Sequence, residues 1–292
     1  MSNFESRDSA VTVFDTNQWV ESNRKDFTPP VCNKCMFSEQ LKVFFVGGPN
    51  SRNDYHLEEG EEVCGIFFQI KGDMVLKVVE NGIQKDVKIR EGELFLLPAY
   101  VEHSPQRFEN TLGCVVERER SSDEYDCVRY FVDGTDNQIL WERWFHLKDV
   151  VKDLPPVIRK FNESAEKANG KPGDGSFERE APYKPKNLKL PSPINLAEYI
   201  DKNLTEINKT PQHLFKEVDA RAQLILYGNG THQLKAEANE LVLLFQRGSG
   251  ELIYESESTK IQSYFATRVK PKSKVTLKIA DGVCLVASIP PK

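Results

Sequence analysis

Residues 92–103 read Gly-Glu-Leu-Phe-Leu-Leu-Pro-Ala-Tyr-Val-Glu-His. The largely apolar run from Glu93 to Leu97 has the length of a strand, and Pro98 ends it because proline cannot donate a hydrogen bond within a central ladder. Just upstream, Asn81-Gly82 separates the runs 74–79 and 86–89, and this dipeptide is the strongest local signal for a β-hairpin. These patterns predict β-structure in this part of the chain.

The same rhythm of short apolar runs and turn signals extends from residue 43 to residue 119, as in a β-sandwich or barrel. A segment rich in Lys, Gly, Pro, Asn and Glu, residues 165–191, is predicted to be a linker. A short helix is expected within 195–204, and short strands return over 222–289 with turns at 227–230 and 247–250. We therefore expect an all-β fold in which one architecture is used twice, in domains 1–164 and 192–292.

Length and composition agree with this division. A chain of 292 residues fits two domains of about 150 residues each. No apolar run reaches the roughly 18 residues that span a bilayer, and the first residues lack the pattern of a secretory signal, so a cytoplasmic location is expected and no membrane partner. The net charge is -5, and the lysines and arginines are interspersed with acidic residues and form no basic stripe. This distribution argues against nucleic acid as a partner.

Six cysteines are spread over the whole chain at positions 32, 35, 64, 114, 127 and 284, and we interpret them as reduced thiols rather than a disulfide framework. Cys32 and Cys35 have the spacing of a metal knuckle. A tetrahedral site would need a second such pair, which the sequence lacks, so these two are interpreted as incidental thiols.

Three residues of the first half, His56, Glu62 and His103, offer a different metal site. Two imidazoles and one carboxylate on neighbouring strands can occupy one face of an octahedral ion and leave the other face open to ligands. This set suits non-haem iron(II) and oxygen chemistry, so the sequence predicts Fe(II) between these three side chains. His213 and His232 have no carboxylate at a matching offset and are expected to be ordinary side chains.

The spacing Gly92-x5-Pro98-x4-His103 resembles the second motif of the cupin superfamily. Asp54-x-His56-x5-Glu62 resembles its first motif, with Asp in place of the first histidine. Cupins are double-sheet jelly rolls closed into small barrels. The resemblance implies a bicupin: two jelly-roll β-barrels with a few short helices, the second being a degenerate cupin unit without metal ligands.

Within the first half a closer similarity is carried by seven runs: Pro29–Lys34, Glu39–Val43, Gly47–Asn50, Asp54–His56, Glu58–Val63, His103–Phe108 and Val115–Arg118. Together these runs resemble the animal 3-hydroxyanthranilate 3,4-dioxygenase family. The resemblance implies an iron(II)-dependent extradiol opening of 3-hydroxyanthranilate by O2. The product would be 2-amino-3-carboxymuconate semialdehyde, in the kynurenine pathway toward quinolinate and NAD, and the family also implies a monomer.

Residues near the motifs fit such a substrate. Arg107 lies four residues after His103 and offers a bidentate guanidinium to the substrate carboxylate. Glu117 is expected to accept a hydrogen bond from the amino or hydroxyl group and to take a proton as the substrate binds. The resemblance implies the same roles for both residues, and it also implies that Glu62 contacts the substrate.

Three further residues are assigned from the resemblance. Arg52 is the residue of this sequence that would contact the substrate and stabilise dioxygen or superoxide with a fixed positive charge. Asp54 and Asn33 would orient the ligands and the substrate-binding side chains.

Two other interpretations remain open. A catalytically impaired or regulatory bicupin would keep the fold as a binding module and lose the reaction. A cupin isomerase or thiol dioxygenase would act on a different substrate and would not need Arg107.

The interval from Glu62 to Gly72 is longer than in the general cupin pattern by about the length of Cys64-Gly65-Ile66. An odd insertion in a strand turns every later side chain to the other face unless the extra residues are looped out. The sequence therefore predicts a bulge at residues 64–66, for which Gly65 supplies permissive dihedral angles. The insertion either disturbs the neighbouring carboxylate ligand or is absorbed by the barrel without consequence.

Overall fold

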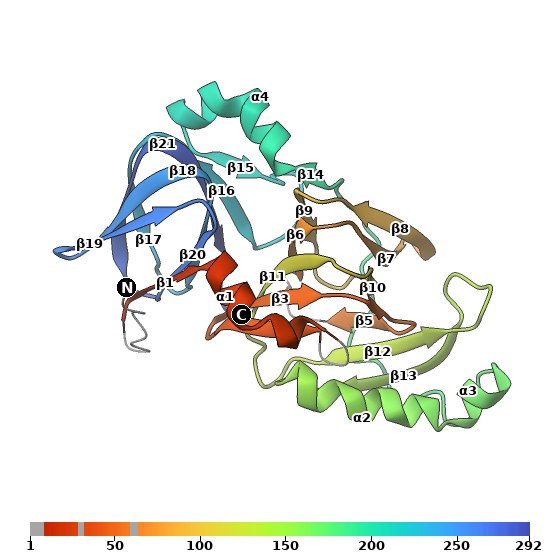
Figure 1. The fold of residues 1–292 in the computed structure, drawn as a ribbon. Coiled ribbons are helices and arrows are strands. Elements are labelled where there is room, and N and C mark those ends of the chain that lie inside the picture. Colours follow the sequence, from red (N-terminus) through yellow and green to blue (C-terminus); the bar gives the residue numbers. More distant parts are fainter. Residues whose placement is uncertain (1–8, 29–31, 59–63) are drawn as a thin grey trace.

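The computed structural model describes residues 9–28, 32–58 and 64–292 (Figure 1). In the described part of the chain, no helix is both long and apolar enough to cross a membrane. Among the side chains that the structure describes, the cysteines at positions 32, 35, 114, 127 and 284 are free thiols.

The first barrel consists of two antiparallel sheets. Their strands are β2 (Asn33–Ser38), β3 (Leu41–Gly47), β4 (Asn50–Ser51), β5 (Tyr55–Glu58), β6 (Cys64–Lys71), β7 (Met74–Glu80), β8 (Ile83–Ile89), β9 (Glu93–Leu97), β10 (His103–Arg107), β11 (Leu112–Arg118), β12 (Asp126–Phe131), β13 (Ile139–Phe145) and β14 (Ile194–Asn195). One sheet has the order β13-β12-β5-β10-β7-β8, with β4 beside β10, and the other has the order β14-β9-β6-β11-β3-β2.

The second barrel is one curved sheet with the order β1-β20-β18-β21-β16-β15 (Figure 1). Its strands are β1 (Val11–Asp15), β15 (Gln212–Leu214), β16 (Gln223–Tyr227), β17 (Gly230–Lys235), β18 (Leu241–Tyr254), β19 (Glu257–Gln262), β20 (Phe265–Val269) and β21 (Lys274–Ser288). The helices are α1 (Thr16–Ser22), the 3-10 helix η1 (Arg24–Phe27), α2 (Val150–Asn162), α3 (Ala165–Asn169) and α4 (Leu196–Lys209). The prediction of an all-β bicupin with few helices is confirmed.

Several local predictions are also confirmed. Asn81 and Gly82 have φ angles of 53° and 77° and join β7 to β8, as a two-residue hairpin turn requires. Strand β9 ends at Leu97, directly before Pro98. Helix α4 begins after Asn195, whose side chain accepts a hydrogen bond from the backbone N–H of Glu198 at 3.0 Å.

The turn expected at residues 247–250 is wrong, because β18 continues through these residues. Gly248 has a φ of 74°, lies opposite Gly282 of β21, and stands between two shifts in the register of these strands. A Cβ at Gly248 would lie 1.9 Å from the carbonyl oxygen of Asp281. The glycines therefore permit a bulge in a long bent strand, and the chain does not reverse there.

Strand pairing crosses between the two halves of the chain in two places. Strand β1 pairs with β20 of the second barrel, and β14 pairs with β9 of the first. The division into 1–164, a linker and 192–292 stays a prediction.

Residues 170–193 form no helix or strand and lie along the first barrel. The Tyr183 hydroxyl donates to the carbonyl of Tyr125 at 2.7 Å, and the backbone N–H of Leu190 donates to the Glu80 carboxylate at 2.7 Å. This segment therefore packs as an ordered strap, which its composition does not predict.

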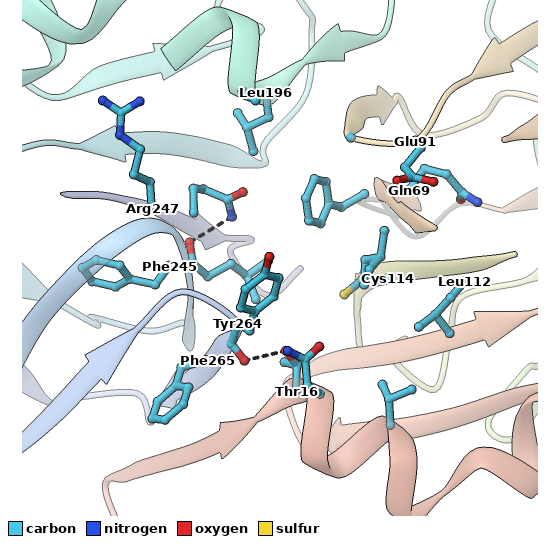
Figure 2. A pocket seen from close by; sticks show the side chains of 18 of the residues that line it. Thr16, Gln69, Glu91, Leu112, Cys114, Leu196, Phe245, Arg247, Tyr264 and Phe265 are labelled. Carbon is cyan, nitrogen blue, oxygen red and sulfur yellow. Dashed lines mark hydrogen bonds between the residues drawn. The ribbon is translucent and has the colours of Figure 1, made fainter. Parts of the chain in front are cut away.

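The two barrels share one hydrophobic core cluster, which includes Phe45 and Val116 from the first barrel and Leu244 and Leu285 from the second. Beside it lies a cavity of about 600 Å³, across which residues of the two barrels face each other (Figure 2). The second barrel thus covers an apolar face of the first.

The bulge predicted near residues 64–66 is confirmed. Cys64 lies opposite Leu97 and Phe67 opposite Phe95, so β6 has one residue more than β9 between these two pairs. The barrel accommodates an extra residue at this point and recovers its regular alternation afterwards.

Candidate metal centre and its cavity

His56 and His103 come from neighbouring antiparallel strands. They lie directly opposite each other in the register between β5 and β10, which places both side chains on the same face of the sheet. Their ring centroids are 5.5 Å apart, and both residues are buried. The sheet pairing thus brings together two imidazoles that are far apart in the sequence.

A carboxylate completes this cluster. Glu58 lies two residues after His56 on β5 and therefore faces the same side of the sheet. One ligand atom from each of His56, Glu58 and His103 lies within 4.8 Å of the other two. Two imidazoles and a carboxylate at such separations are a donor set that can hold a divalent metal ion.

His103 is in the state that a metal requires. Its Nδ1 makes a hydrogen bond of 3.0 Å to the carbonyl of Val101, which makes Nδ1 the donor and leaves the lone pair on Nε2. Burial lowers the pKa of His103 to about 3, so the ring is neutral at physiological pH. Neutral imidazole is the form that ligates metals.

Glu62, the carboxylate ligand predicted from the sequence, lies outside the described residues and stays a prediction. Glu58 is therefore a second carboxylate to consider. Sequence reasoning missed it, although its alternation with His56 along one strand was a usable signal.

A buried charge network surrounds the cluster. Asp126 makes a hydrogen bond of 2.7 Å to Nε2 of His56 and accepts another from Nε of Arg120 at 2.9 Å. The Arg120 guanidinium also pairs with Glu58 and lies 3.4 Å from Glu117. Burial raises the pKa of Glu58 well above its ordinary value, and the charge of Arg120 opposes that shift. The single positive charge of Arg120 is thus shared among three carboxylates.

A cavity of about 140 Å³ adjoins the two histidines. Its polar lining comprises Asn33, Asn50, Arg52, His56, His103, Arg107, Glu117 and Arg120. Its apolar lining comprises Phe44, Val46, Pro105, Val115, Leu147, Val150 and Leu154, the last two from α2. The structure therefore brings Asn33, Arg52, His56, His103, Arg107 and Glu117 to one cavity, as an active site would require.

Arg107 is the distinctive residue of this cavity. Its side chain is buried, with the residue 3% exposed, and no carboxylate pairs with it in the part of the chain that the structure describes. Burial lowers the pKa of Arg107 to about 10, so it remains a cation at neutral pH. A buried cation without a counter-charge among the described residues can pair with an anionic group that enters the cavity.

The sequence profile of the 3-hydroxyanthranilic acid dioxygenase family matches residues 9–162. The chain belongs to this family. The 3-hydroxyanthranilate 3,4-dioxygenase of Caenorhabditis briggsae is 48% identical over 283 residues, which cover 97% of this chain and 99% of the relative. The protein of the same name from Homo sapiens is 48% identical over 216 residues, or 74% of each chain.

The fold has a solved counterpart. A salicylate 1,2-dioxygenase from Pseudaminobacter salicylatoxidans matches with a TM-score of 0.55 and 12% identity over 99% of this chain and 87% of that chain. At this identity the match bears on the fold alone. It supports the fold of two β-barrels described above.

In this member of the dioxygenase family, Arg52 pairs with Asp54 rather than standing alone, and its Nε donates to Oδ1 at 3.1 Å. Burial raises the pKa of Asp54, but the charge and hydrogen bonds of Arg52 outweigh this effect and lower it overall. Asp54 therefore contacts Arg52, which lines the cavity.

Sequence reasoning missed Arg120 and Asp126. Arg120 lies two residues beyond the end of β11, where the period-two alternation of a strand no longer indicates which face a side chain takes. Asp126 reaches the site because β12 pairs with β5, a long-range contact that no local pattern encodes.

Proposed function

We propose that this chain catalyses the ring opening of 3-hydroxyanthranilate by O2 with Fe(II) as its metal, giving 2-amino-3-carboxymuconate semialdehyde. The reaction would take place in the cytoplasm, on the route to quinolinate and NAD. The observation that carries the proposal is the buried Arg107, which has no carboxylate partner among the described residues and lines the same cavity as His56 and His103. The names of the relatives support the choice of substrate.

The residues present fit a metal of this kind, because two imidazoles and a carboxylate offer nitrogen and oxygen donors within 4.8 Å of one another. His56, His103 and one carboxylate would hold the ion. When bound, iron(II) supplies open coordination positions and a redox-active centre for oxygen chemistry.

The protein residues would bind and orient the substrate. Arg107 would clamp the carboxylate with two parallel hydrogen bonds, which fixes the ring relative to the histidines. Glu117, buried beside Arg120, would accept a proton from the hydroxyl or amino group. Arg52, held by Asp54, would present positive charge to developing negative charge, and the apolar wall around Leu147 would exclude water.

The test uses protein purified without air and loaded with iron(II) under ascorbate. We expect oxygen uptake and the ultraviolet absorption of the semialdehyde, both requiring iron and 3-hydroxyanthranilate. Stoichiometric iron without product would favour the impaired or regulatory bicupin. Turnover of another substrate that persists in Arg107→Ala would favour a cupin isomerase or thiol dioxygenase.

The carboxylate ligand can be assigned with two matched variants. Glu58 is already paired with the buried Arg120, and this ion pair competes with a metal for the carboxylate. We therefore expect Glu62→Gln to lower iron affinity by at least about tenfold and Glu58→Gln to retain stoichiometric iron. Iron content after dialysis against a weak chelator measures this, and the reverse pattern would assign the ligand to Glu58.

The bulge near the metal gives a further prediction. Its extra length lies directly after the segment that contains Glu62, and we expect it to displace this carboxylate and weaken iron binding. Deleting residues 64–66 should then raise iron occupancy and activity when iron is limiting. An iron titration of the deletion variant beside the parent protein decides the point, and a lower occupancy would contradict the claim.

A further inference from the structure

We propose that Gln69 is a positioning residue that sets the orientation of Arg107 in the cavity, and that Gly113 provides the space for this contact. The proposal deepens the proposed function, since it concerns how the substrate carboxylate is received. It begins from a hydrogen bond of 3.2 Å, in which Nη1 of Arg107 donates to Oε1 of Gln69.

Gln69 is held firmly at both ends of its amide. Its side chain is fully buried, and its Nε2 donates to the backbone carbonyl of Lys71 at 3.1 Å. This second bond determines which end of the amide is the oxygen, so that an acceptor faces Arg107. A buried acceptor with a fixed direction constrains the plane of the guanidinium.

Gly113 makes the contact possible. It lies opposite Gln69 in the register between β11 and β6, next to a bulge where Leu112 is paired with Lys71. A Cβ at Gly113 would lie 2.5 Å from Nη1 of Arg107 and 2.8 Å from Oε1 of Gln69. Both distances are too short for non-bonded atoms, so any side chain here would displace the pair.

The chemical type of residue 69 is informative. Glutamine accepts a hydrogen bond without carrying charge, so it orients Arg107 and leaves its positive charge available to a ligand. A glutamate would serve equally well as an acceptor but would neutralise the guanidinium and compete with an incoming carboxylate. A neutral acceptor is therefore what an anion receptor requires at this position.

The decisive variant is Gln69→Glu, compared with wild type by equilibrium dialysis of metal-free protein. The two ligands are 3-hydroxyanthranilate and 2-aminophenol, which lacks the carboxylate. We expect affinity for 3-hydroxyanthranilate to fall by roughly thirtyfold or more and affinity for 2-aminophenol to stay within about twofold. A general loss of structure would weaken the binding of both ligands together.

Two more variants keep the proposal open to refutation if Gln69→Glu does not fold. Gln69→Met removes the acceptor at similar size, and Gly113→Ala occupies the space. Each should lower affinity for 3-hydroxyanthranilate by roughly tenfold and spare 2-aminophenol. Gln246→Glu is the matched charge control, because Gln246 lies on β18 across the cavity between the barrels, and it should bind both ligands as wild type does.

The outcomes separate this proposal from the proposed function. Wild-type affinity for 3-hydroxyanthranilate in folded Gln69→Glu or Gly113→Ala would overturn the positioning role, whatever the enzyme catalyses. Carboxylate-selective loss in the variants, together with no turnover by iron-loaded wild type, would keep the positioning role and refute the proposed reaction.

Discussion

Arg107→Ala is expected to retain the metal and to lose about 2 to 5 kcal/mol of binding free energy for 3-hydroxyanthranilate, because it removes one half of a desolvated charge pair. The buried guanidinium has no carboxylate partner in the described structure, so alanine leaves no buried carboxylate unpaired there, and the polar contact that it removes is the hydrogen bond to Gln69. Isothermal titration without air, with iron content measured on the same samples, tests both parts.

Two controls sharpen this result. Arg107→Lys keeps the charge but loses the planar fork, so it should recover only part of the affinity. Arg90→Ala removes an arginine that pairs with Glu93, and its side chain is 62% exposed, so binding should not change. Wild-type affinity in Arg107→Ala would refute the assignment of the substrate carboxylate to this residue.

His103→Ala is expected to lose both the metal and the activity, since the remaining imidazole and carboxylate cannot hold iron(II) against buffer. The loss should be a failure of metal binding and not of folding, because alanine keeps the backbone of β10 and its pairing with β5 and β7. Metal analysis and thermal unfolding of the same sample distinguish these possibilities.

His232→Ala serves as the control for His103. His232 lies on β17 of the second barrel, where its Nε2 contacts the carbonyl of Gly228 at 2.8 Å, far along the chain from the cluster. It should bind iron as wild type does. Stoichiometric iron in His103→Ala would show that the ligand set is misassigned.

Local chemistry made much of the fold predictable. Asn81 and Gly82 adopt positive φ angles that few other residues tolerate, and these angles form the turn. Strand β9 ends before Pro98 because proline has no backbone N–H to donate. The glycines around residue 248 misled because the same backbone freedom serves either a chain reversal or a bulge. Whether such glycines form a turn or a bulge depends on the pairing with the neighbouring strand, which the sequence pattern does not show.

The site was predictable where motif spacing carried it, as for His56 and His103. Asp126 and Gln69 escaped prediction because each acts through a partner strand or a bulge. The strap over residues 170–193 escaped for a related reason, since its composition is that of a linker while its hydrogen bonds, such as that of Tyr183, are made to the first barrel.

The pairing of β1 with β20 has a consequence for how the protein is made. Asp15 pairs with Phe265, so β1 leaves the ribosome 250 residues before its partner. At roughly 5 to 20 residues per second, that interval lasts on the order of ten to fifty seconds, during which β1 has an unpaired backbone edge. The second barrel, and not the first, takes in the N-terminal strand. The first strand to emerge is therefore built into the barrel that is completed last.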